Sequence, residues 1–144
     1  MVGDAISTEA GRLPYEKIIH AVGPRWNRMA TSDDSVYNLE NCIESCFEEM
    51  KKLRLNSIAI PPISTGIFGF PLELAVKTIV KTVLRLDKKM ALPKTVIFID
   101  NKNDSLGLFE RELRAATSAV AENNRQALGA TAHTGNKFAG SQFT

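Results

Sequence analysis

The stretch that decides the fold is residues 57–71, which read SIAIPPISTGIFGFP. Its first four residues are a compact apolar run typical of a buried strand, and its last residue, Pro71, is a favourable first residue for a helix. Between these two elements lie two glycines three residues apart, Gly66 and Gly69. The stretch therefore predicts a strand that leads through a glycine-containing loop into a helix.

On both sides of this stretch, the chain alternates short apolar runs with longer amphipathic segments. The runs predict strands at residues 18–22 and 96–99, with a shorter strand at 4–8. Apolar residues at steps of three and four predict helices over residues 35–53, from 71 to about 86, and over 106–120. Side-chain oxygens that could cap the first helix precede it, at Ser32, Asp33 and Asp34. This alternation predicts an α/β domain whose mostly parallel sheet is covered on both faces.

Length and composition fit one globular domain. The chain has 144 residues, of which 44% are hydrophobic and 24% charged, with a formal net charge of +2. Its apolar runs reach about four residues, whereas a membrane span needs about twenty. The near-neutral charge argues against a dedicated nucleic-acid binder. With no secretory signal and two free cysteines, we expect a nuclear or cytoplasmic protein. Residues 122–144 are polar and aperiodic, and we expect a linker or disordered tail there.

The loop between the strand and the helix has the chemistry of an anion site. In parallel sheets, ligands bind where strands lead into helices, here after residues 22, 60 and 99. Gly66 and Gly69 allow backbone N–H groups to approach an anion, and the following helix end adds further donors. A phosphate could thus be held without a lysine, while Phe68 and Phe70 could wall a sugar or base. On local chemistry alone, an ordinary strand-to-helix turn explains the segment equally well.

Three segments together carry a resemblance to a known family. They are Leu13-Pro14 ahead of Ile19-His20-Ala21-Val22-Gly23-Pro24, the run from Ser57 to Pro71, and Val96-Ile97-Phe98-Ile99. In order and spacing over about residues 3–121, the chain resembles the macro domain, the ADP-ribose-binding family of the Appr-1"-p-processing type. It looks most like the macro domains of the multi-macrodomain poly(ADP-ribose) polymerases.

The resemblance implies a three-layer α/β/α fold, with a mostly parallel or mixed sheet, that binds ADP-ribose. By position, the loop that wraps the diphosphate and distal ribose corresponds to Ser64, Thr65, Gly66, Ile67 and Phe68, and Gly69 is counted among the ligand-binding residues. The floor of the cleft corresponds to Ala21, Val22 and Gly23, and the adenine-side wall to Asp100 and Asn101. The implied partners are ADP-ribose and mono- or poly-ADP-ribosylated proteins, with no cofactor and no metal.

The resemblance also implies that part of the domain is missing. A complete macro domain carries, before the segment that matches Gly3-Asp4-Ala5, its opening strands and about a third of its length. That part holds an acidic residue that reads adenine, an Asn-Ala-Ala-Asn-type stretch and a Gly-Gly-Gly loop. Residues 1–121 would then be the C-terminal two-thirds of a macro domain.

Three functions stay open at this point. The first is a binding module for ADP-ribose or ADP-ribosylated protein. The second is an ADP-ribosyl hydrolase, and we favour binding over it because the family's groups for hydrolysis lie largely in the missing part. The third is a protein-interaction domain without a ligand, since a chain or segment that completes the sheet could pair with its strands.

Four further residues have simpler structural interpretations. We expect His20, within an apolar strand, to be a core histidine. Cys42 and Cys46 lie one helical turn apart and are expected to be small buried hydrophobes, because zinc needs about four ligands. Trp26 is expected to be a packing residue in a surface loop. None of these residues carries a motif for catalysis.

Overall fold

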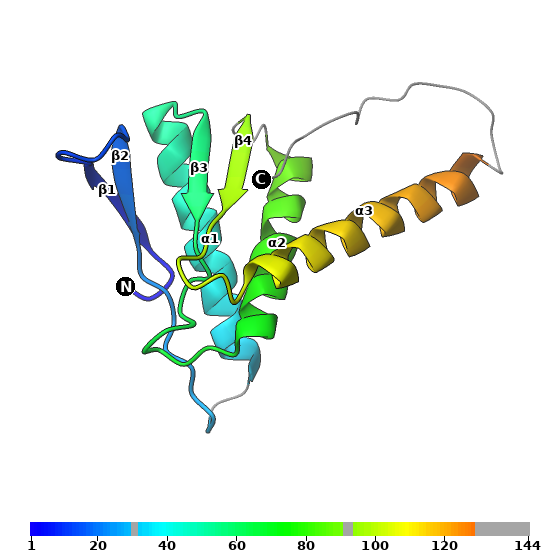
Figure 1. The fold of residues 1–144 in the computed structure, drawn as a ribbon, viewed down its shortest axis with the longest axis horizontal. Helices are drawn as coiled ribbons and strands as arrows, with labels where there is room; N and C mark the ends of the chain where they lie inside the picture. The colour runs from blue at the N-terminus through cyan, green and yellow to red at the C-terminus, as the bar shows by residue number, and fades with distance from the viewer. Residues whose placement is uncertain (30–31, 91–93, 129–144) are drawn as a thin grey trace.

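The computed structural model describes residues 1–29, 32–90 and 94–128. The elements of this part of the chain alternate as the sequence predicts (Figure 1). In chain order they are β1 (Ala5–Glu9), β2 (Lys17–Ala21), α1 (Ser32–Leu53), β3 (Ser57–Ile60), α2 (Leu72–Lys89), β4 (Thr95–Phe98) and α3 (Leu106–Leu128).

The strands form two small sheets of opposite type. β1 and β2 pair antiparallel from Ala5↔Ala21 to Glu9↔Lys17, whereas β3 and β4 pair parallel from Ser57↔Thr95 to Ile60↔Phe98. Among the described residues, one two-stranded sheet is therefore antiparallel and the other is parallel. Figure 1 shows the chain leaving β2, β3 and β4 at the same end of the molecule, which gathers the three loops that follow these strands.

The core lies where α1 and α2 pack on β3 and β4. The helices bury the apolar stripes that their spacing predicts, with Leu39, Ile43, Phe47 and Met50 from α1 and Ala75, Val76, Ile79, Val80, Val83 and Leu86 from α2. The strands add Ile60, Val96 and Phe98. The Phe98 ring stacks on Phe109 of α3, with centroids 4.5 Å apart. This core fixes the strand ends from which two of the three loops start.

The strands β3 and β4 are covered on one face only in the described part of the chain. Their alternate residues Ser57, Ala59 and Thr95 are exposed, and Ile97 is half-buried. The prediction that these strands are buried on both faces is wrong for this part of the chain. The reason is that α1 and α2 bury only the even-numbered positions, as the period of two in a strand requires.

The helix ends differ from the prediction by a few residues. Asp33 and Asp34 lie in the first turn of α1 and not before it, where their charge favours the positive helix end. α2 continues three residues beyond Leu86. α3 continues to Leu128, so residues 123–128 are helical and exposed, and the predicted tail boundary at 122 falls inside a helix. Arg125, Gln126, Ala127 and Leu128 favour helix without needing to be buried. Residues 129–144 lie outside the described residues.

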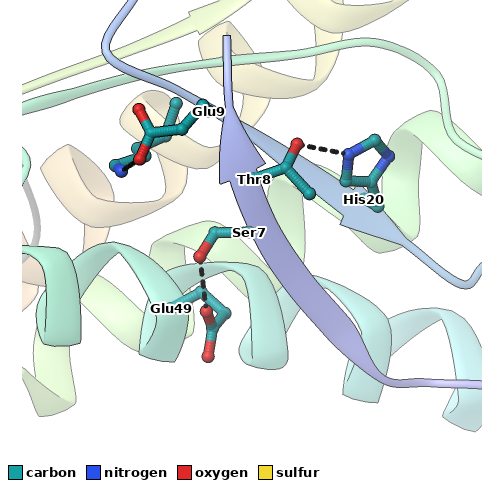
Figure 2. A network of polar contacts seen from close by, with 6 residues as sticks. Ser7, Thr8, Glu9, His20 and Glu49 are labelled. Atoms are coloured by element: carbon teal, nitrogen blue, oxygen red, sulfur yellow. Dashed lines mark hydrogen bonds and ion pairs between the residues drawn. The ribbon is translucent and has the colours of Figure 1, made fainter.

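The hairpin of β1 and β2 rests on α1 through polar contacts. The Ser7 hydroxyl donates to Glu49 of α1 at 3.1 Å, as Figure 2 shows, and Ser45 of α1 donates to the Gly3 carbonyl at 2.8 Å. Contrary to the core position predicted for it, His20 is exposed, and its Nε2 lies 2.8 Å from the Thr8 hydroxyl. Because side chains alternate along a strand, the neighbour Ile19 packs toward the core and His20 points away from it.

The two cysteines lie inside α1's buried face, as predicted. Cys42 is fully buried and Cys46 is 5% exposed. The hydrogen bond with Cys42 and the burial of the thiol raise the pKa of Cys46. A thiol in this setting stays protonated and behaves as a small core residue.

Candidate functional site

The loop between β3 and α2 is folded tightly by its own backbone. The Phe70 N–H donates to the Ser64 carbonyl at 3.0 Å, and the Gly69 N–H donates to Gly66 at 3.0 Å. The Thr65 hydroxyl donates to the Pro62 carbonyl at 2.7 Å. Gly69 has φ +68°, a left-handed conformation that explains why a glycine occupies this position. Ser64 adopts the same left-handed region, with φ 68°. A non-glycine residue in this region is held there by its surroundings, a feature common at ligand sites.

Three consecutive N–H groups at the tip of this loop are free. Among the described residues, the backbone N–H groups of Gly66, Ile67 and Phe68 donate to no other group, and all three residues are exposed. α2 begins directly after the loop, and its N-cap residue Pro71 offers no side-chain hydrogen bond. Successive free N–H groups beside a helix N-terminus favour an anion.

The Ser64 hydroxyl is the one buried side-chain polar atom in the described residues that has no hydrogen-bond partner. It lies against the end of β2: a Cβ added at Gly23 would lie 2.2 Å from Ser64 Oγ and 2.7 Å from a methyl group of Ile63. Only glycine at position 23 permits this approach. The close contact brings the segment after β2 against the loop after β3.

Trp26 joins the same two segments. Its backbone N–H donates to the Phe68 carbonyl at 2.8 Å, and its ring packs on Phe70 with centroids 4.9 Å apart. The prediction of a packing role for Trp26 is confirmed. Phe70 is 2% exposed, so the prediction that it walls a ligand is wrong: its ring belongs to the core. Phe68 is 43% exposed, and the Arg25 guanidinium lies 5.9 Å from its ring centroid.

The segment after β4 begins beside the loop after β3, because these two strands pair with each other. The Ile99 N–H donates to the Ile60 carbonyl at 3.1 Å. The Asp100 carboxylate accepts from the N–H of Lys102 at 2.9 Å and from both the N–H and the hydroxyl of Ser105 at 2.8 Å. These hydrogen bonds, led by that of Lys102, lower the pKa of Asp100. The carboxylate thus orders the turn that precedes α3, and Asn101 beside it is exposed.

The structure brings together most of the residues singled out in the sequence. Ser64 to Gly69 lie in the loop after β3 and Gly23 touches it at Ser64, while Ala21 is half-buried and Val22 is 42% exposed at the end of β2. Sequence reasoning missed Arg25 as a site residue. Its position between a Gly-Pro turn and a tryptophan is a weak signal. Its place over Phe68 depends on the Trp26–Phe68 hydrogen bond, which no local pattern predicts.

Two features are absent from the described residues: a cluster of metal ligands and a membrane-spanning helix. They contain no group of three or more His, Cys, Asp or Glu side chains placed to hold a metal ion. No helix in this part of the chain is both long enough and apolar enough to cross a membrane.

The described elements form an α/β domain whose loop after β3 offers free backbone N–H groups at the carboxyl ends of its strands. The macro domain family profile matches residues 1–79, and the chain therefore belongs to the macro domain family. It is 44% identical over 121 residues to protein mono-ADP-ribosyltransferase PARP14 of Homo sapiens, covering 82% of this chain and 7% of that protein. It is 33% identical to O-acetyl-ADP-ribose deacetylase of Escherichia coli K12, covering 77% of this chain and 62% of that protein.

Solved structures agree with this assignment. The Oceanobacillus iheyensis macrodomain with ADP superposes with a TM-score of 0.72 at 28% sequence identity, over 83% of this chain and 61% of that chain. A point mutant of the same macrodomain with ADPR gives a TM-score of 0.72 over 82% of this chain and 62% of that chain. These similarities confirm the macro-domain-like α/β fold predicted from the sequence. The chain spans less than two-thirds of the length of these relatives.

Proposed function

We propose that this chain is a binding module for ADP-ribose, free or attached to protein, with the diphosphate held by the loop tip. The observation that carries the proposal is the row of free N–H groups at Gly66, Ile67 and Phe68, next to the unpartnered hydroxyl of Ser64. Neutral donors fixed in place can bind a diphosphate at little cost in ordering, because the loop is already folded by its own hydrogen bonds.

The relatives support this choice of ligand. The Oceanobacillus iheyensis macrodomain has been solved with ADP and, as a mutant, with ADPR, and both ligands contain an adenosine diphosphate group. PARP14 is by name a mono-ADP-ribosyltransferase, which favours ADP-ribosylated protein as a second form of the ligand.

We assign the other surfaces of the site from their positions. Phe68 is half-exposed and offers a ring face, and Arg25 adds a positive charge on that ring's side of the loop. Ala21, Val22 and Gly23 form the floor at the end of β2. Asp100 and Asn101 form the adenine-side wall, with Asp100 acting through the turn that it orders, because its carboxylate already accepts three hydrogen bonds.

We propose binding in preference to hydrolysis, although one relative is named a deacetylase. A general base needs a free basic atom within reach of the substrate. The pKa of Asp100 is lowered by its hydrogen bonds, which makes this carboxylate a weak base. His20 bonds to Thr8 on the exposed face of the hairpin. We expect no release of ADP-ribose from modified protein, and sustained turnover by the purified chain would overturn this.

Calorimetric titration with ADP-ribose tests the proposal. Gly66→Glu places bulk and negative charge at the loop tip, where a Cβ meets no atom within 4 Å, so we expect binding to vanish without unfolding. Ser118→Glu adds the same charge on the exposed side of α3 and is the matched control, for which we expect unchanged binding. Equal binding by wild type and Gly66→Glu, or no binding by wild type, would contradict the proposal.

We also propose that a further segment or chain pairs with the sheets. Each strand belongs to a two-stranded sheet, so each has one unpaired edge in the described part of the chain. Large apolar side chains are exposed nearby, with Ile6 63%, Val22 42% and Ile99 44% exposed. Such edges and surfaces invite pairing. We expect the chain to bind an apolar dye and Ile6→Lys to bind less of it; equal dye binding by both would count against this surface.

A further inference from the structure

A second surface lies between α2 and α3, away from the loops that form the ADP-ribose site. A groove of about 430 Å³ runs there, with a floor of aliphatic side chains. Val80 and Leu84 of α2 form one side of the floor, and Ala115 and Ala116 of α3 form the other. The two helices diverge beyond their contact in Figure 1, and the groove lies between residues 77–88 of α2 and 112–116 of α3.

The rim of the groove is basic. Lys77, Lys81 and Lys88 line it from α2, and their spacings of four and seven residues place them on one helical face. All three are exposed, and none forms an ion pair with another described residue. The fourth cation on the rim, Arg85, is paired with Glu44 at 2.6 Å. Glu112 is the single carboxylate among the lining residues.

The apolar floor continues along α3 past the groove. Leu113, Ala116 and Val120 follow one another at helical spacing, and Leu113 packs against the core. Val120 is 48% exposed, so the outer part of this stripe has no cover in the described part of the chain. An apolar stripe beside a row of unpaired lysines is a surface with two chemically distinct halves.

We propose that this groove binds an acidic amphipathic helix of another protein. The apolar side of such a helix would pack on Val80, Leu84 and Ala116, and its carboxylates would face the three free lysines. From Lys77 to Lys88 the groove follows about three turns of α2, or about 16 Å, which a helix of about 11 residues spans. The site would let one molecule bind ADP-ribose and a partner protein at separate places.

The chain's own sequence does not supply this occupant. Residues 129–144 contain no Asp or Glu, and their charged residue is Lys137. The lining residues also include no aromatic ring on which a base could stack, which distinguishes the groove from the usual surface for single-stranded nucleic acid. A second copy of the chain remains an outcome that the experiment detects.

The test is fluorescence anisotropy with three labelled 14-residue peptides. The first has Leu at positions i, i+4, i+7 and i+11 and Glu on both sides of that stripe; the second replaces each Glu with Lys; the third replaces each Leu with Ser. We expect the first peptide alone to bind, and we expect Lys81→Glu combined with Lys88→Glu to weaken it at least tenfold. Both substituted side chains are exposed, so the variant keeps the fold and its ADP-ribose titration.

Five results would overturn the proposal. The first peptide does not bind, or it binds wild type and the double variant equally. The Ser-containing peptide or a single-stranded RNA of equal charge binds as tightly as the first peptide, which would reduce the groove to a general anion surface. Light scattering finds a dimer of the wild-type chain that the double variant lacks, which would make a second copy the occupant.

Discussion

The two sheets of this molecule are held in different ways. β3 and β4 contribute Ile60, Val96 and Phe98 to the core, whereas no residue of β1 or β2 is fully buried. The hairpin rests on α1 through contacts such as Ser7–Glu49. The candidate site lies across both regions, because its loop follows the core strand β3 and its floor follows β2. Stability and ligand affinity should therefore respond differently to changes in each region.

The contacts that join the two regions are few and well defined. Gly23 packs on Ser64, and Trp26 bonds to Phe68 and stacks on Phe70. We therefore expect changes in the core strands to unfold the domain. Changes at the junction of Gly23 and Trp26 with the loop should separate the floor of the site from the loop, and changes at the loop tip should affect ligand binding alone.

The largest effect is expected at Phe70, which anchors the loop in the core. Phe70→Ala removes a ring that is 2% exposed and packed on Trp26, and we expect a loss of about 3–5 kcal/mol in the free energy of unfolding. His20→Ala in the exposed face of the hairpin should cost less than about 0.5 kcal/mol. Urea denaturation of both variants measures this, and equal losses would contradict the difference between the regions.

The next effect is expected at the junction. Gly23→Val forces side-chain atoms into the space of Ser64 Oγ and Ile63, and we expect a loss of about 1–3 kcal/mol in stability together with a loss of ADP-ribose binding. Denaturation and calorimetry on one preparation give both quantities. A variant that binds ADP-ribose like the wild type would show that the end of β2 is not part of the site.

A smaller effect, of opposite sign for stability and affinity, is expected at Ser64. Its hydroxyl is buried without a partner, and an unsatisfied polar group costs about 1–3 kcal/mol. Ser64→Ala should keep or slightly raise the free energy of unfolding. It should also weaken ADP-ribose binding, though less than Gly66→Glu does. A clear fall in stability would mean that the hydroxyl has a partner in solution.

The smallest effect concerns acid stability. The pKa of Asp100 is lowered in the folded chain by the hydrogen bonds from Lys102 and Ser105. A carboxyl group with a lowered folded pKa stabilises the protein fully above its unfolded pKa of about 3.9, and this contribution is lost as the pH falls through the folded value. Asp100→Asn should make stability less dependent on pH below about 4 than in wild type. Identical pH profiles for both would contradict a folded-state role for these bonds.

The sequence predicted what depends on local pattern. The strand at Ser57–Ile60 and the apolar stripes of α1 and α2 follow from periodicity, and the free N–H groups at the loop tip follow from Gly66 and Gly69. It did not predict that His20 faces outward, because a run of apolar residues in a strand does not tell which face is covered. Nor could the sequence predict where Arg25 lies or that Phe70 is buried. Both depend on contacts with Trp26, which lies more than forty residues before Phe70 in the chain. The contact between Gly23 and Ser64 is likewise long-range.

The central claim is that the loop tip binds the diphosphate through its backbone. The most direct measurement is titration of the ¹⁵N-labelled chain with ADP-ribose, followed by amide resonances in NMR. We predict the largest shifts at Gly66, Ile67 and Phe68, smaller shifts at Gly23 and Arg25, and none along the outer half of α3. Saturating shifts confined to other parts of the chain, or no shifts at all at millimolar ADP-ribose, would contradict the claim.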